Sequence, residues 1–357
     1  MPQATETASR LDSLTGMRFF AAFLVFGFHA LHYGDAPGLG FFGAGMTGVS
    51  FFYIVSGFVL AWSARSGTTA LVFYGRRFAR IYPAYIGAWV VALVLLVVTG
   101  AGLSGVDLLP PTLLQAWVPD EDAYFATNAV FWSLSVEAFF YAMFPFIFPV
   151  LARRGRASLT GICAACVGAT WAVAVIADQF KGDDTRLWAM AIFPPTRLPE
   201  FVLGMALALL VRQGFRVPVS LWWPALLSVG AVGLAGVVPD AYSRVAVTVV
   251  PFALLVYAGA VTDIAGRATV LRSRTLVELG VWSYAFYLIH TQVLAVCAEA
   301  ATRLGHPPAD LDTPARLIWW VGALGASILA SYLLHALVER PAERRLRPRP
   351  RPSVTTQ

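Results

Sequence analysis

Charged residues are scarce in this sequence. Asp, Glu, Lys and Arg together make up 13% of its 357 residues, whereas hydrophobic residues make up 58%. A soluble domain contains about 25% charged residues, and the mean hydropathy of this chain is high, at +0.68. The composition therefore excludes a soluble globular protein and predicts an integral membrane protein.

Cysteine is almost absent, with three residues in the whole chain. Cys163 and Cys166 have the spacing of a redox or metal-binding motif, but they lie in an apolar stretch without a second pair, which favours two small buried thiols. His29 and His32 are spaced to share a metal ion, yet no third ligand is evident nearby, so we expect no metal site. The sequence also lacks a Walker-type loop, a dinucleotide fingerprint and an internal repeat, which excludes a nucleotide-binding domain of either type.

Long apolar runs are what the sequence has in abundance. Ten stretches of about 20 residues are apolar enough to cross a bilayer, and short polar, Gly-rich or Pro-rich connections separate them. We therefore predict an all-α polytopic membrane protein with about ten transmembrane helices. The expected spans are 17–33, 45–64, 81–101, 129–151, 157–178, 193–212, 218–237, 242–262, 276–300 and 315–338.

The distribution of basic residues predicts the orientation of these spans. Twenty of the 26 Lys and Arg residues fall in the two terminal segments and in the connections after the second, fourth, sixth and eighth spans, against six on the opposite face. By the positive-inside rule both termini are cytoplasmic, which predicts a multi-pass protein of the bacterial cytoplasmic membrane. Basic loops beside anionic lipid also explain the net charge of +6, so we expect no nucleic-acid partner.

Two ionisable side chains lie in the first apolar segment. Arg18 and His29 are eleven positions apart, about three helical turns, and so share one face. Glu137, at the outer end of the fourth span, is predicted at a similar depth to His29. A carboxylate beside a neutral imidazole fixes its tautomer and increases its basicity, which predicts that His29 is a general base oriented by Glu137. The alternative is a buried polar pair that only ties the first and fourth spans together.

A cluster of arginines precedes the third span. Arg76 and Arg80 share a helical face and Arg77 flanks them, while Arg18 is predicted at the same depth. Several guanidinium groups at one place suit a polyanion, and phosphates are the expected ligand. The alternative is that these arginines only anchor the helix at the cytoplasmic face.

Other polar and small residues enter the remaining spans. In the second span, Ser56 and Gly57 favour close helix packing. Arg197 and Glu200, three positions apart, are predicted to form a structural ion pair. Six further side chains are candidates to contact the substrate or to stabilise an oxyanion, namely Trp132, Ser135, Ser283, Tyr284, Tyr287 and His290.

Six segments stand out in order along the chain. They are 14–18 (LTGMR) with ten residues before His29, 51–58 (FFYIVSGF), 76–83 (RRFARIYP), 132–137 (WSLSVE), 197–205 (RLPEFVLGM) and 283–290 (SYAFYLIH). Together they resemble the signature blocks of the acyltransferase-3 family of integral membrane acyltransferases, and the likeness extends from about residue 10 to 340. The resemblance implies transfer of an acyl group, usually acetyl from acetyl-CoA, to a hydroxyl of a carbohydrate or related acceptor. It also marks as functional Arg18, His29, Arg77, Arg80 and Glu137.

The resemblance is to a stand-alone form of this family. Many members continue into an extracytoplasmic hydrolase-like domain, whereas this chain ends soon after its tenth predicted span. The chain is similar to stand-alone actinobacterial members that acylate sugars of macrolides or other secreted metabolites, and exopolysaccharide, cell-wall and glycolipid acceptors stay open. We expect a cytoplasmic tail over 1–13, the acyltransferase domain over 14–340, and a basic, Pro-rich, disordered tail over 341–357.

The residues and the resemblance together predict a mechanism without a metal cofactor. Acyl-CoA approaches from the cytoplasm, its phosphates bind the arginine cluster, and its pantetheine arm reaches His29, which removes the proton of the acceptor hydroxyl. An acyl-His29 intermediate is an open variant. The rival interpretation is a transporter or flippase for a glycosylated or anionic substrate, because intramembrane charges also suit a transport path. A third interpretation is a non-catalytic subunit of a larger assembly.

Overall fold

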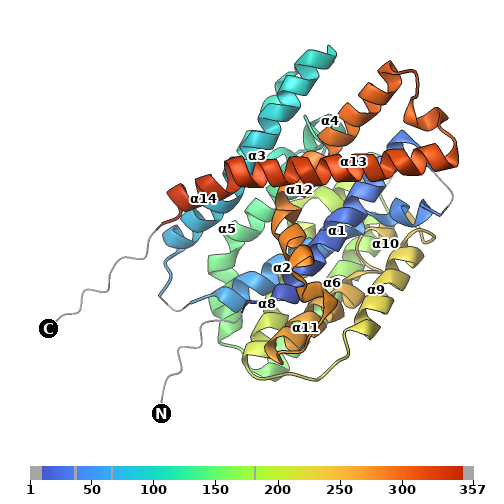
Figure 1. The fold of residues 1–357 in the computed structure, drawn as a ribbon. Coiled ribbons are helices and arrows are strands. Elements are labelled where there is room, and N and C mark those ends of the chain that lie inside the picture. The colour runs from blue at the N-terminus through green and yellow to red at the C-terminus, as the bar shows by residue number, and fades with distance from the viewer. Residues whose placement is uncertain (1–9, 36–37, 66, 181, 349–357) are drawn as a thin grey trace.

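Helices account for the regular structure of the chain. The computed structural model describes residues 10–35, 38–65, 67–180 and 182–348, and no β-strand occurs within those ranges (Figure 1). Ten helices have 14 or more residues: α1 (Asp12–Ala30), α2 (Thr47–Ser63), α3 (Ala70–Thr99), α5 (Trp132–Ala152), α6 (Arg156–Ala177), α8 (Pro194–Arg212), α9 (Trp222–Ala235), α11 (Val249–Ile264), α12 (Arg274–Arg303) and α13 (Thr313–Leu334). The short helices are α4 (Glu121–Tyr124), α7 (Asp183–Leu187), α10 (Asp240–Ser243) and α14 (Arg340–Leu346).

Each predicted span overlaps one of the ten long helices. Seven helical stretches are long and apolar enough to cross a membrane, and they contain α1, α3, α5, α6, α8, α12 and α13. The apolar helices α2, α9 and α11 have 17, 14 and 16 residues, which is about 21–26 Å of rise against about 30 Å of hydrocarbon. The chain is therefore an all-α polytopic membrane protein, in which seven stretches reach full spanning length and three helices are shorter than predicted.

The helix α2 lies at the centre of the bundle. Twelve of its 17 residues are buried, and its most extensive packing is against α8. A Cβ atom on Gly57 would lie 2.0 Å from the carbonyl oxygen of Phe201, and one on Gly204 would lie 2.0 Å from that of Ile54. The two backbones are therefore in direct contact, as is common where small residues meet between membrane helices. This confirms Gly57 as a close-packing position.

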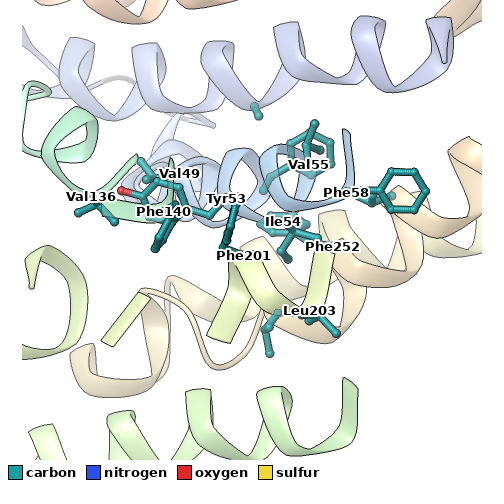
Figure 2. Packing of buried hydrophobic residues seen from close by; sticks show 14 of the residues in the cluster. Val49, Tyr53, Ile54, Val55, Phe58, Val136, Phe140, Phe201, Leu203 and Phe252 are labelled. Atoms are coloured by element: carbon teal, nitrogen blue, oxygen red, sulfur yellow. The ribbon is translucent and has the colours of Figure 1, made fainter. Parts of the chain in front are cut away.

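Aromatic side chains attach two further helices to this crossing, as Figure 2 shows. Phe140 of α5 stacks on Phe201 of α8 with 4.8 Å between ring centroids, and Tyr53 of α2 meets Phe140 edge-on at 4.9 Å. On another side of α2, Phe51 meets Phe252 of α11 at 5.7 Å. Offset and edge-on pairs of this kind add to the energy of burial, so α5 and α11 are held in fixed positions around α2 and α8.

The helices α1 and α12 run parallel and touch through glycine. A Cβ atom on Gly280 of α12 would lie 1.9 Å from the carbonyl oxygen of Thr15 in α1. Further along the same pair, a side chain of α1 and one of α12 meet, at His29 and His290. The contact at Gly280 thus sets the register that brings the two histidines together.

The arginine cluster lies on α3, which begins earlier than the predicted third span. Thr69 ends the preceding loop and its hydroxyl accepts a hydrogen bond from the backbone N–H of Val72, a typical N-cap. Helix formation from residue 70 places Arg76, Arg77 and Arg80 on the same continuous helix as the apolar segment that follows.

The C-terminal segment continues as a helix. A π-helical turn, His335–Glu339, joins α13 to α14, so that the two form one long run at the surface of the bundle (Figure 1). Both the turn and α14 pack against α3. The prediction of a disordered tail over 341–357 is therefore wrong for 341–346, because these residues form a helix that packs against α3. Residues 349–357 lie outside the described residues. Residues 1–9 of the predicted N-terminal tail also lie outside them.

Candidate active site

A cavity of about 420 Å³, here called the central cavity, lies between α1, α2, α3, α5, α12 and α14. Its apolar walls include Phe52, Leu134 and Ile81. The structure brings to it most of the side chains that the sequence singled out. Its charged and phenolic residues are Arg18, Tyr53, Arg77, Arg80, Glu137, Tyr141, Tyr284, Tyr287, Glu343 and Arg347.

Three of the four predicted phosphate-binding arginines line the central cavity. Arg18 lies with its guanidinium carbon 6.0 Å from the ring centroid of Phe52. Arg80 Nη1 donates a hydrogen bond to Glu343 Oε2 at 3.2 Å, and Arg77 is a third arginine of the wall. Arg76, the fourth, does not line this cavity but a neighbouring one. The predicted cluster is therefore divided between two spaces.

The neighbouring space, here called the arginine cavity, has a volume of about 780 Å³. It shares four wall residues with the central cavity, which are Leu60, Ser63, Arg77 and Arg347. The two cavities therefore adjoin through a common wall.

Glu137 lies in the central cavity, but it does not orient His29. Its Oε1 accepts hydrogen bonds from the hydroxyls of Ser56, at 3.2 Å, and Tyr141. Among the described residues no hydrogen bond joins Glu137 to His29, so the predicted pairing is wrong. The helix α5 presents Glu137 to Ser56 of α2, in the same cavity as Arg18, which lies about three helical turns before His29 on α1.

The partner of His29 is His290. His29 Nδ1 lies 3.0 Å from the carbonyl oxygen of Val25 and 3.1 Å from His290 Nε2. His290 Nδ1 lies 2.9 Å from the carbonyl oxygen of Tyr287. Because carbonyl oxygens only accept, each Nδ1 carries the hydrogen in a neutral pair, and the single hydrogen on His29 Nδ1 is shared between the Val25 carbonyl and His290 Nε2. This assignment leaves His29 Nε2 with a free lone pair, as a general base requires.

Tyr287 connects the histidine pair with the central cavity. Neither histidine lines the cavity, but the side chain of Tyr287 does, and its backbone carbonyl receives the hydrogen bond from His290. The Tyr287 hydroxyl donates to Ser133 Oγ at 2.8 Å, and Ser133 is another wall residue. The end of the cavity at Tyr287 and Ser133 is therefore adjacent to the candidate base.

The other predicted substrate or oxyanion residues divide into two groups. Ser283 and Tyr284 line the central cavity, although their hydroxyls donate to the backbone carbonyls of Gly280 and Ile81. Trp132 and Ser135 are buried away from it, and Ser135 Oγ donates to the carbonyl of Leu113 at 2.6 Å. The latter two stabilise the start of α5 and do not face the cavity.

Sequence reasoning placed His290 among the oxyanion candidates and missed it as the partner of His29. The signal was present, because the first and ninth predicted spans run in the same direction and each carries its histidine beyond the middle. The sequence did not indicate that these two spans are neighbours.

Arg197 and Glu200 form the predicted structural ion pair. Both side chains are buried, with Arg197 Nε donating to Glu200 Oε2 at 2.6 Å. The guanidinium also donates to Ser50 Oγ at 3.0 Å and lies 4.9 Å from the Tyr53 ring centroid. The pair therefore ties α8 to α2, outside the central cavity. Within the described residues no group of three or more His, Cys, Asp or Glu is arranged to hold a metal ion, and the three cysteines are free thiols.

A multi-pass helical bundle whose buried cavity collects arginines, a carboxylate and hydroxyls beside a histidine pair has the features of an intramembrane enzyme. Residues 11–336 match the family described as acyltransferase domain, and the chain belongs to this family, acyltransferase-3. The family assignment covers all the elements that form the central cavity except α14.

Three curated proteins are similar to this chain over nearly their whole length. Acyltransferase MdmB of Streptomyces mycarofaciens is 36% identical, with 94% of this chain and 92% of the relative covered. Nodulation protein 10 of Rhizobium leguminosarum bv. viciae is 26% identical, with 96% and 95% covered. Exopolysaccharide production protein ExoZ of Rhizobium meliloti (strain 1021) is 29% identical, with 86% and 92% covered. No solved structure matches the chain.

Proposed function

We propose that this protein transfers an acyl group, most simply acetyl, from acyl-CoA to a hydroxyl of a carbohydrate or glycosylated acceptor, in the cytoplasmic membrane of a bacterium. The observation that carries the proposal is the central cavity, which has arginines along one part and adjoins a histidine pair at another. The names of two relatives support it, since one is an acyltransferase and one takes part in exopolysaccharide production. Macrolide sugars, cell-wall glycans and glycolipids are the other acceptor classes within the proposal.

The arginines of the central cavity bind the phosphates of acyl-CoA in this proposal. Arg18, Arg77 and Arg80 come from two helices and converge on one cavity, and guanidinium groups bind phosphate oxygens with two parallel hydrogen bonds. With its phosphates at this end, the thin pantetheine arm of acyl-CoA extends along the cavity toward Tyr287. The carboxylate of Glu137, held by Ser56 and Tyr141, is a counter-charge to the arginines in this arrangement.

His29 is the general base in this proposal. Its Nε2 takes the proton of the acceptor hydroxyl while the oxygen attacks the thioester carbonyl, and the C–S bond then breaks as the CoA thiolate leaves with the proton that His29 returns. His290 is a positioning residue, since its Nε2 accepts from His29 Nδ1 and stabilises the imidazolium that forms. In direct transfer to the acceptor, His29 is the base. In the variant with an acyl-His29 intermediate, the same residue is the nucleophile.

Two measurements test this function. The purified protein, reconstituted in nanodiscs, is titrated with acetyl-CoA, and we expect a rise in melting temperature that grows with concentration. Mass spectrometry then compares glycans and secreted metabolites of a strain with and without the gene, and we expect a hydroxylated compound to lose an acyl mass. A transporter or flippase has no need to bind acetyl-CoA. If neither the rise in melting temperature nor the loss of an acyl mass were observed, the acyltransferase proposal would be wrong and transport would be the favoured function.

A further inference from the structure

The arginine cavity is lined by five arginines from three parts of the chain. Arg65 follows α2, Arg76 and Arg77 belong to α3, and Arg344 and Arg347 belong to the C-terminal segment at α14. Of the described residues that line it, none is acidic. Like charges at one place repel one another, so five guanidinium groups around one space call for an anion.

Two of these arginines also have unused donors. Within the described residues, the Nε atoms of Arg76 and Arg77 are buried without a hydrogen-bond partner. A buried donor without a partner costs free energy, and each of these two belongs to a side chain that lines the cavity. A polyanion in the cavity would neutralise the charge of the five arginines and accept hydrogen bonds from the unpaired Nε atoms of Arg76 and Arg77.

Part of the wall of the arginine cavity is aromatic. Phe73 and Phe144 are stacked with 4.8 Å between centroids, and Phe144 and Phe148 are stacked at 5.1 Å. All three line the cavity, together with Pro145 and Pro149. Aromatic faces beside arginines are the combination with which proteins hold a nucleotide, because the base stacks and the phosphates bind the cations. This wall favours a nucleotide over a bare phosphate or a lipid headgroup.

We infer that the arginine cavity is the subsite for the phosphorylated nucleoside of the donor, and that Arg344 and Arg347 are two of the five arginines that bind its phosphates. The inference rests on the proposed function, because it requires a donor with a polyanionic nucleotide joined to a thin thioester arm. The two cavities adjoin at Leu60, Ser63, Arg77 and Arg347, so a ligand with its nucleotide in one and its thioester arm in the other extends past these four residues. The C-terminal segment is then part of the donor site, although the family match ends at residue 336.

The test compares substitutions on one helix. Arg344→Gln, Arg347→Gln and the double variant are measured against Arg345→Gln, which makes the same change in charge on α14 at an exposed residue that lines neither cavity. Affinity of the full chain in neutral nanodiscs is measured for acetyl-CoA, for its 3′-dephospho analogue and for acetyl-pantetheine. Adenosine 3′,5′-bisphosphate is used as a competitor.

We expect the double variant to bind acetyl-CoA at least about tenfold more weakly, since charge-assisted contacts to phosphate are lost. The loss should be smaller for the 3′-dephospho analogue and absent for acetyl-pantetheine, whose unchanged affinity also shows that the variant is folded. Arg345→Gln should stay within about twofold of the parent. Adenosine 3′,5′-bisphosphate should displace acetyl-CoA.

Three results would overturn the inference. If Arg345→Gln lost as much affinity as Arg344→Gln and Arg347→Gln, α14 would contribute only general charge. If anionic phosphatidylglycerol in the nanodisc weakened acetyl-CoA binding to the parent and not to the double variant, the cavity would take lipid headgroups. If the parent bound acetyl-CoA and the double variant bound it equally well, the subsite would lie elsewhere. Failure of the parent itself to bind acetyl-CoA would instead contradict the proposed function.

Discussion

At the scale of single residues, the proposed mechanism depends on which nitrogen of the His29 imidazole carries the hydrogen. The carbonyl oxygens beside His29 and His290 fix both hydrogens on Nδ1, so His29 presents an unprotonated Nε2 without needing a carboxylate. In the proposed mechanism, a base without a carboxylate partner depends on the backbone for its tautomer and on a second histidine for the stabilisation of its charged form.

Replacement of His29 tests the base. We expect His29→Ala to lower acyl transfer at least about 100-fold, because general-base catalysis contributes that much, while the shift in melting temperature with acetyl-CoA is retained. The two readouts are measured on the same preparation. Near-normal transfer by a folded variant would remove His29 from the mechanism.

Replacement of His290 tests positioning. His290→Leu removes one of the two acceptors for His29 Nδ1 and leaves only the Val25 carbonyl, and we expect transfer to fall about 10- to 100-fold. His290→Gln keeps an oxygen that can accept the same hydrogen bond and should restore much of the loss. Equal activity of the two variants would contradict a positioning role, since both change the packing at this site but only one keeps the acceptor.

The residue types of the cavity were predictable from the sequence, but their partners were not. Arg18, Arg77, Arg80, Glu137, Ser283, Tyr284 and Tyr287 were chosen because polar groups in apolar segments are costly and are kept for a task, and all of them line the central cavity. The direction of a side chain around its helix axis depends on which helices are neighbours. The positive-inside rule gives only depth, and so Glu137 was assigned to the wrong partner.

At the scale of helices, the glycine contact between α1 and α12 controls the distance between the two histidines. In Gly280→Ala, the new methyl group would meet the carbonyl oxygen of Thr15. We expect a lower melting temperature, with about 1–3 kcal/mol of destabilisation from overpacking, and reduced acyl transfer. Gly322→Ala is the control, because it lies in α13 with no atom within 4 Å of a new Cβ.

The outcomes for these two glycines should differ in sign. Alanine is the better helix former by about 1 kcal/mol, so Gly322→Ala should leave the melting temperature unchanged or raise it. If Gly280→Ala were as stable and as active as Gly322→Ala, the α1–α12 contact would not set the register of the histidine pair.

The helices themselves were easier to predict than their ends. Long apolar runs located all ten long helices, because hydropathy alone is enough for that. The start of α3 at residue 70 was missed because its apolar first turn is followed by Gly75, Arg76 and Arg77, which interrupt the apolar run. The helix α14 was missed because a basic, Pro-rich sequence does not indicate order, and it is packing against α3 that stabilises it.

At the scale of the whole molecule, the charge distribution predicts orientation. The excess of basic residues in the terminal segments and even-numbered connections should place both termini in the cytoplasm. A fluorescent protein fused to either end should fluoresce in cells, and alkaline phosphatase at the same positions should be inactive. An active phosphatase fusion at either end would contradict the predicted topology and the side from which acyl-CoA enters.

The carboxylate of Glu343 should change how the binding of acetyl-CoA at the proposed donor site depends on salt. Glu343 lines the central cavity, where its Oε2 lies 3.2 Å from Arg80 Nη1 and its Oε1 lies 3.8 Å from Arg347 Nη1. It is thus a counter-ion that the chain carries itself, and a phosphate that binds Arg80 must compete with it. Because the displaced carboxylate stays attached to the protein, fewer dissolved anions are released when the donor binds, and affinity should depend less on salt than the number of arginines suggests. Glu343→Gln should therefore bind acetyl-CoA more tightly at low salt and lose affinity more steeply as salt rises, which a titration at several ionic strengths will measure.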